Sequence, residues 1–108
     1  MSSGFKVKLT FKKLALEEWN SIPAPIREKF KKALAKRMES LDALTMPKNR
    51  LSLKHNCYKI KLKNDGYRLA YTVRDDENGE VSVVVSVVAV DRRDEIYNEL
   101  KKRLDADV

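Results

Sequence analysis

The sequence has few of the residues that most often carry catalysis or cross-links. Among 108 residues it has one histidine, one cysteine, three glycines and three prolines. A single cysteine, Cys57, cannot form a disulfide within the chain, which favours a reducing compartment. A single histidine excludes a histidine pair for acid–base catalysis. The glycines match no P-loop or dinucleotide site, and His55 with Cys57 does not make a metal site, so we expect no cofactor and no metal.

Long hydrophobic runs are also missing. The longest apolar stretch, residues 83–90, is far shorter than a membrane span. The first residues, MSSGFKVKLTF, lack the apolar segment of a secretory signal. We therefore expect a cytoplasmic protein with no membrane partner, forming one domain over residues 1–108.

Positive charge is in excess. The chain has 23 Lys and Arg against 16 Asp and Glu, a formal net charge of +7. This balance favours an anionic partner such as nucleic acid, the ribosome or an acidic protein. Many small soluble proteins are basic, so the charge alone does not choose among these partners.

Residues 57–73 predict a β-hairpin. They read CYKIKLKNDGYRLAYTV, with apolar and polar residues alternating on both sides of an Asn-Asp-Gly turn. If Asp65 and Gly66 form a two-residue loop, Lys63 pairs with Arg68, Leu62 with Leu69, Lys61 with Ala70 and Ile60 with Tyr71. Tyr58, Ile60 and Leu62 then share one face. The other face carries Lys59, Lys61, Lys63 and Arg68.

The remaining pattern predicts an α+β fold in the order β-α-α-β-β-β-α. The expected elements are a strand at 5–11, helices at 12–21 and from Pro25 to about 41, a loop at 42–56 with an extended piece at 51–53, the hairpin, a turn at 75–79, a strand at 80–90 and a last helix carrying Ile96, Leu100 and Leu104. The β-branched strand at 80–90 is typical of a central strand covered on both faces. We expect an antiparallel-rich four-stranded sheet with an N-terminal helical hairpin and a C-terminal helix. We expect the helices on the apolar face, with Trp19 in the core and the lysine face open.

A cluster of lysines and arginine can hold a phosphate and neutralise charge that develops on it. A lysine crowded by other cations has a lowered pKa, and its neutral form can act as a base. In RNA cleavage, the RNA supplies its own nucleophile, the 2′-hydroxyl, so the protein needs only to position this group, take its proton and protonate the leaving 5′-oxygen. Alternating lysines on the outer face of a sheet are also typical of a solvated surface that limits edge pairing.

Three stretches resemble the RelE family of bacterial toxins. They are the hairpin CYKIKLKNDGYRLAYTV, the following VVAVDRRDEIY, and LALEEWNSIPAPIREKFKKAL in the N-terminal half. The resemblance is close from Cys57 to about Leu104. It implies a toxin of a type II toxin–antitoxin system, an mRNA interferase that cleaves mRNA in the A site of the 70S ribosome. It also implies a RelB-like antitoxin that wraps around the toxin, with DNA contacted only through the antitoxin complex.

The resemblance also implies roles for five residues. Lys59 and Lys61 match family lysines implicated in activating the 2′-hydroxyl and holding phosphate, and Arg68 matches a phosphate ligand. Arg93 matches an arginine assigned to the leaving group, where charge stabilisation is chemically preferable to proton donation. Tyr97 matches a tyrosine expected to stack on the attacked nucleotide, although it could instead cap the edge of the core.

Two departures from the family pattern leave choices open. The family often has an arginine where this chain has Ser52, and Arg50 or Lys54 could replace its contact. Between Val90 and Tyr97 the chain is shorter than in the family members that look most similar. Arg92 therefore competes with Arg93 for the catalytic assignment. Further cations expected to face RNA or the ribosome are Lys63, Arg50, Lys54, Arg92, Lys32 and Lys36.

Two other functions remain open. A ParE-like toxin would share the fold and act on DNA gyrase, but it is not expected to retain the lysines and arginine of the KIK and GYRL segments. A non-catalytic module would use the basic sheet to bind rRNA or an acidic protein. For the antitoxin we expect an apolar helix and acidic groups, with the last helix of the toxin displaced or clamped.

Overall fold

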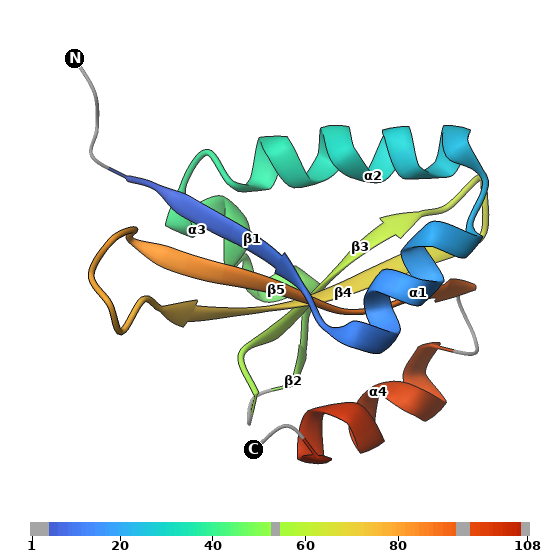
Figure 1. Cartoon of the computed structure of the whole chain (residues 1–108). Coiled ribbons are helices and arrows are strands. Elements are labelled where there is room, and N and C mark those ends of the chain that lie inside the picture. Colours follow the sequence, from blue (N-terminus) through green and yellow to red (C-terminus); the bar gives the residue numbers. More distant parts are fainter. Residues whose placement is uncertain (1–4, 53–54, 93–95, 107–108) are drawn as a thin grey trace.

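The computed structural model describes residues 5–52, 55–92 and 96–106. One mixed sheet in the order β1-β5-β4-β3-β2 runs through the molecule. Figure 1 shows α1 and α2 on one side of this sheet and α4 on the other. The expected α+β class and element order are confirmed, but the sheet has five strands rather than four.

The elements have the following bounds. The strands are β1 Val7–Phe11, β2 Arg50–Ser52, β3 Cys57–Leu62, β4 Tyr67–Asp75 and β5 Val83–Arg92. The helices are α1 Lys13–Ser21, α2 Ala24–Arg37, α3 Leu41–Leu44, the short 3₁₀ turn η1 Pro47–Asn49, and α4 Ile96–Ala106.

The larger core lies between the sheet and the two N-terminal helices. Proline occupies the first turn of α2, where its missing N–H costs no hydrogen bond. Ile26, Phe30 and Leu34 follow at helical spacing and are buried. Trp19 of α1 packs beside Phe30, with ring centroids 6.3 Å apart. This confirms Trp19 as a core residue.

A second, smaller core lies on the other face of the sheet. Leu100 and Leu104 of α4 pack there against Cys57, Ala70 and Val88. The expectation that all helices lie on one face, leaving the lysine face open, is therefore wrong. The reason is β5, whose residues 83–90 are all buried and which needs cover on both faces.

Two side-chain contacts hold α4 in place. The guanidinium of Arg103 donates from Nη1 and Nη2 to the two carboxylate oxygens of Glu18 in α1, each at 2.8 Å. At the C-terminal end of α4, Asp105 Oδ1 lies 3.1 Å from His55 Nε2. These pairs connect α4 with α1 and with the chain before β3.

The strand β5 begins three residues later than predicted and ends two residues later. The carboxylate of Asp76 accepts hydrogen bonds from the backbone N–H groups of Asn78, Glu80 and Val81, which keeps the chain in a loop. The same bonds lower the pKa of Asp76 below its usual value. After this loop β5 pairs parallel with β1 and antiparallel with β4.

The hairpin has a different register from the predicted one. Leu62 pairs with Tyr67, and Lys61 pairs with Arg68. The loop therefore has four residues, 63–66, and the carbonyl of Leu62 accepts from the N–H of Gly66 at 2.9 Å. Gly66 has φ +73°, a left-handed conformation that glycine adopts without strain. The shift is two residues, so the faces of both strands stay as predicted.

The segment predicted as a loop is more ordered than expected. The side chain of Ser40 accepts from the N–H of Ala43 and caps α3. Leu41, placed by the sequence on the stripe of the second helix, instead begins α3 and is exposed. Further on, β2 pairs antiparallel with β3 through Arg50 and Ser52, and supplies the fifth strand.

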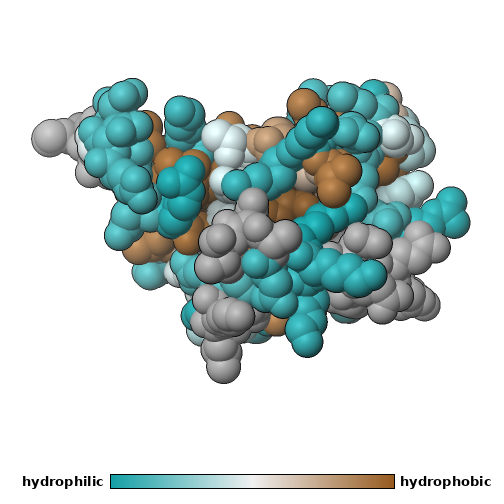
Figure 2. Space-filling model, turned by 60° about the horizontal axis from the view of Figure 1, so that its bottom comes forward, coloured by the Kyte–Doolittle hydropathy of each residue, from teal (hydrophilic) through white to brown (hydrophobic). Residues whose placement is uncertain are grey.

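Figure 2 turns the side that carries α4 toward the viewer. Hydrophilic side chains cover most of the described surface in this view, with hydrophobic ones in recesses between them. Within the described part of the chain, no helix has both the length and the apolar character needed to cross a membrane.

Candidate functional site

The basic face consists of Lys59 and Lys61 of β3 and Arg68 of β4. Side chains two residues apart on a strand share a face, so Lys59 and Lys61 lie side by side. Lys61 and Arg68 are direct partners in the antiparallel ladder. Like charges directly opposite are unfavourable in a sheet. Two cations placed in this way can donate to the same phosphate, so the arrangement is suited to binding one.

The edge of α4 borders the basic face. Cys57 and Ala70, which α4 covers, lie on the same face of the hairpin as the three cations. Lys59 and Arg68 are half-buried and Lys61 is exposed. The cations therefore sit at the margin of a packed helix, on two hydrogen-bonded strands, which fixes their backbone positions.

An irregularity in β5 lies beside this margin. The ladder between β4 and β5 shifts by one residue between Ala70 and Tyr71, so that Val88 is the extra residue. A β-bulge bends a strand locally and often lies next to a functional site. Beyond the bulge, Asp91 is the direct partner of Arg68. The sequence reasoning missed this acid because only the β4–β5 register brings it to the basic face.

Arg92 lies on the other side of the sheet. Its guanidinium carbon is 6.0 Å from the ring centroid of Tyr67, which packs against the larger core. A hollow on this side is lined by Arg92 together with Glu17 and Glu18 of α1. The structure therefore does not bring Arg92 to Lys59, Lys61 and Arg68.

Three residues assigned from the sequence cannot be placed as side chains. Arg93 and Lys54 lie outside the described residues. Tyr97 belongs to the first turn of α4, but its side chain is outside the described part. Their assigned roles stay predictions.

The other predicted RNA-facing cations divide into two groups. Lys63 is in the hairpin loop, and together with Lys61 and Arg68 it lines a hollow of about 220 Å³. Arg50 instead lies over the ring of Tyr58, 5.6 Å from its centroid, on the side of α2. Lys32 and Lys36 are exposed on α2, on the opposite side of the sheet from the basic face.

Two titratable groups are buried near the site. Burial raises the pKa of the Cys57 thiol to about 12. Burial also raises the pKa of the Tyr71 hydroxyl, although a hydrogen bond from Arg37 opposes this. Both groups are therefore neutral near pH 7. We place neither group in the chemistry.

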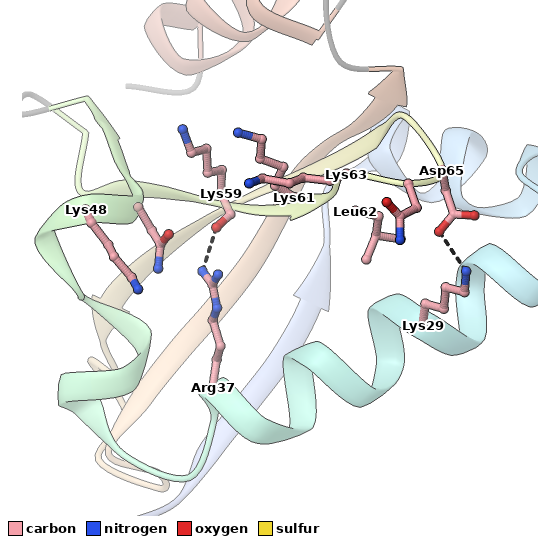
Figure 3. A pocket seen from close by; sticks show the side chains of 10 residues that line it. Lys29, Arg37, Lys48, Lys59, Lys61, Leu62, Lys63 and Asp65 are labelled. Atoms are coloured by element: carbon pink, nitrogen blue, oxygen red, sulfur yellow. Dashed lines mark hydrogen bonds and ion pairs between the residues drawn. The ribbon is translucent and has the colours of Figure 1, made fainter.

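Sequence reasoning missed a second set of cations. Arg37 of α2 and Lys48 of η1 line a groove with Lys59, Lys61 and Lys63 (Figure 3). In the sequence, Arg37 belongs to the charged face of a helix and Lys48 to a polar loop. No pattern along the chain indicates that both reach the edge of β3.

Comparison with known proteins gives one family over most of the chain. Residues 9–97 match the family described as ParE toxin of type II toxin–antitoxin system. The chain is 40% identical over 98 residues to the mRNA interferase toxin RelE of Escherichia coli strain K12. That alignment covers 89% of this chain and 95% of the relative.

Solved structures of RelE proteins agree with this family assignment. A variant of E. coli RelE in the free state matches with a TM-score of 0.75 and 37% identity, over 93% of this chain and 99% of that one. The intact E. coli RelBE toxin–antitoxin complex matches with a TM-score of 0.67 and 36% identity, over 82% of this chain and 98% of that one. The chain therefore belongs to the RelE/ParE superfamily of toxins of type II toxin–antitoxin systems, as the resemblance in its sequence predicted.

Proposed function

We propose that this toxin is a ribosome-dependent endoribonuclease that cleaves mRNA in the A site of the 70S ribosome and so inhibits translation in the cytoplasm. The observation that carries the proposal is the pairing of Lys61 with Arg68, with Lys59 beside them on the same face. The relative that is 40% identical is named an mRNA interferase, which supports the same activity.

The reaction is an attack of a 2′-hydroxyl on the adjacent phosphate. The 2′-oxygen loses its proton and forms a bond to phosphorus, and the bond from phosphorus to the 5′-oxygen breaks. The 5′-oxygen takes up a proton from water, so the products are a 2′,3′-cyclic phosphate and a 5′-hydroxyl. Arg68 is suited to hold the non-bridging oxygens, because its planar guanidinium can donate two parallel hydrogen bonds to a phosphate. Lys59 and Lys61 are the candidates for taking the proton of the 2′-hydroxyl, and both hold charge near the phosphate.

Arg93, which follows β5 in the sequence, and Tyr97 of α4 would complete the site. Arg93 would stabilise charge on the leaving 5′-oxygen, and Tyr97 would stack on the attacked nucleotide. The ribosome would hold the mRNA in line for attack. Orientation of this kind can contribute about 7–11 kcal/mol to a reaction, which explains why these side chains would act on mRNA held in the ribosome rather than on free RNA.

The test is primer extension on a defined mRNA in purified 70S ribosomes, with the wild-type chain and with Arg68→Ala. We expect a new cut in the A-site codon that requires the ribosome and is lost, by about a hundredfold or more, in the variant. The matched control is Arg74→Ala. Arg74 is exposed on β4, on the same face as Arg68, and six residues along a strand place it about 20 Å away. No cut by folded wild-type protein at any A-site codon would overturn the proposal.

A second function is favoured by one observation, the match to a family described by the ParE toxin. A ParE-like toxin would act on DNA gyrase. An assay of gyrase supercoiling with the purified chain separates the two functions. Inhibition of supercoiling without mRNA cleavage would favour the second, whereas binding to ribosomes with neither activity would favour a non-catalytic module.

We further propose that a RelB-like antitoxin inactivates the chain. The matching RelBE complex supports such a partner. An apolar helix and acidic groups of the antitoxin would engage the helices and the basic face. Pulldown from the native cell should recover a small acidic protein encoded beside this chain, and its absence would contradict this part of the proposal.

A further inference from the structure

A basic groove runs along the edge of β3 and has a volume of about 670 Å³. Figure 3 shows that its side chains come from α2, η1, β3 and the hairpin loop. Its cations are Lys29, Arg37, Lys48, Lys59, Lys61 and Lys63. Asp65 is the acid that lines it.

The groove lies where β3 has no neighbouring strand. β2 pairs only with Cys57 and Tyr58, so among the described residues no strand pairs with β3 beyond Tyr58 on this edge. Arg37 reaches this edge from the last turn of α2. Its Nη1 donates to the carbonyl of Lys59 at 2.6 Å. The edge of the catalytic strand is therefore lined by a guanidinium.

Arg37 is held in a fixed position. Its Nη1 also donates to the hydroxyl of Tyr71 at 3.1 Å, and this hydroxyl donates to the carbonyl of Leu44 at 2.7 Å. Tyr71 is fully buried, so the chain of hydrogen bonds is anchored in the core. Nη1 makes both bonds to the protein. Nε and Nη2 of Arg37 make no hydrogen bond to any residue that the structure describes, and they remain to donate to a ligand. A guanidinium so fixed can grip a phosphate with little loss of side-chain entropy.

The acid in the groove is already neutralised. Asp65 Oδ2 lies 2.7 Å from the ammonium of Lys29. Within the described residues, Arg37, Lys48, Lys59 and Lys63 form no ion pair with a carboxylate. Lys48 is exposed on η1 and, in Figure 3, extends toward Arg37. The groove therefore presents uncompensated positive charge to a polyanion.

We propose that this groove binds the phosphodiester backbone of RNA next to the cleaved position, with Arg37 and Lys48 as phosphate ligands. The inference deepens the proposed function, on which it rests for the position of the scissile phosphate. Lys59 and Lys61 extend from β3 on the side away from α2, whereas Arg37 approaches the same strand from α2 (Figure 3). An RNA strand that crosses the edge of β3 thus meets the basic face and the groove in succession.

The test measures RNA binding without cleavage. One probe is a fluorescent oligoribonucleotide of about ten residues with 2′-O-methyl groups, which has no 2′-hydroxyl to attack. The other is the vacant 70S ribosome. The variants are Arg37→Gln, Lys48→Gln and the double variant. The matched control is Lys6→Gln with Lys13→Gln, which removes two exposed cations beside β1, the opposite edge strand of the sheet.

We expect the double variant to bind at least one probe about tenfold more weakly at low salt. We expect the salt dependence of log K to fall by about 0.7 for each lost phosphate contact, with the control within twofold of wild type. Within the described chain, the exposed Lys48 side chain makes no hydrogen bond or ion pair that the change would break, so Lys48→Gln carries the test if Arg37→Gln does not fold. Weaker binding of the oligonucleotide identifies the substrate backbone as the ligand, and weaker binding of the ribosome alone identifies ribosomal RNA.

The inference would be overturned if the double variant bound both probes as well as the control does. This includes the case in which the double variant loses only its binding to the antitoxin. The outcome is separable from that of the proposed function. If the wild-type chain cuts no mRNA but the double variant loses RNA binding, the groove assignment stands and the nuclease proposal fails. If the chain cuts mRNA and the double variant cuts with unchanged KM, the groove assignment fails alone.

Discussion

Cys57 begins the strand that carries Lys59 and Lys61, but its environment is opposite to theirs. Cys57 is fully buried under α4, whereas Lys61, four residues further along the strand, is exposed. Burial disfavours the thiolate and raises the pKa of Cys57 to about 12. One strand thus holds an inert thiol in the core and amines at the surface.

This burial predicts a loss of stability at alkaline pH. The thiol ionises near 9.0 in the unfolded chain and near 12 in the folded one. Above pH 9 the unfolded state therefore binds fewer protons than the folded state, so the free energy of unfolding falls as pH rises through this range. Between pH 8 and 10.5 we expect Cys57 to account for a loss of roughly 2 kcal/mol.

Urea unfolding at the two pH values, for wild type and Cys57→Ala, measures this loss. The variant should be somewhat less stable at pH 8, because it leaves a small cavity, but should lose less on going to pH 10.5. Tyr71, whose pKa burial also raises, adds a loss above pH 10 that both proteins share. Equal pH dependence in the two proteins would contradict the prediction.

At the scale of elements, the hairpin shows what alternation in a sequence can and cannot fix. The period of two assigns each side chain to a face, and the faces of Lys59, Lys61 and Arg68 were predicted correctly. The register depends on the loop, and the carbonyl of Leu62 accepts from Gly66 to close four residues rather than two. Because the error was an even number of residues, it left the faces unchanged.

The position of α4 could have been inferred but was not. The continuous apolar run of β5 already required cover on both faces. Small residues among the cations, Cys57 and Ala70, marked the second face as partly buried. What the sequence does not contain is the partner of each helix, because Leu100 and Leu104 form an apolar stripe that would fit either face.

The pair of Glu18 and Arg103 predicts how firmly α4 is docked. Beyond the end of β1, side chains rather than a neighbouring strand form hydrogen bonds with the backbone of β5. Glu18 Oε1 accepts from the N–H of Val90 at 3.0 Å, and Arg103 Nη1 donates to the carbonyl of Val88 at 3.1 Å. We expect Glu18→Ala and Arg103→Ala each to lower the free energy of unfolding by about 1.5–3 kcal/mol, because each leaves a partly buried charge and a backbone group unsatisfied.

A double-mutant cycle in urea measures the coupling of this pair, which we expect to be about 1–2 kcal/mol. The control cycle uses Glu28 and Lys31, an exposed ion pair within α2 at 3.1 Å, for which we expect at most about 0.5 kcal/mol. A coupling no larger than that of the control pair would show that the ion pair between Glu18 and Arg103 does not hold α4 in place.

At the scale of the whole molecule, the fold gathers cations that the sequence keeps apart. Arg37 and Lys59 are 22 positions apart, yet a hydrogen bond joins them. Helical periodicity places Arg37 among solvated charges on α2, and only the packing of α2 along β3 turns it toward the sheet edge. The cations of the basic face could therefore be placed together from a local hairpin motif, whereas the groove required the tertiary structure.

The net charge of +7 predicts a steep dependence of mRNA cleavage on salt. Binding to RNA releases counterions in proportion to the phosphates contacted, and about three contacts give a slope of about −2 in log K against log salt. Raising monovalent salt from about 50 to 200 mM should then lower kcat/KM by roughly twentyfold, while kcat at saturating ribosomes changes little.

A chain with two cations removed from the far edge, Lys6→Gln with Lys13→Gln, should show a parallel line in a plot of log kcat/KM against log salt, because charges outside the contact are screened beyond about 8–10 Å. The double variant of Arg37 and Lys48 should show a shallower line. A kcat/KM that is flat over this range would mean that shape and apolar contacts, rather than the cations of the basic face and the groove, bring this toxin to the ribosome.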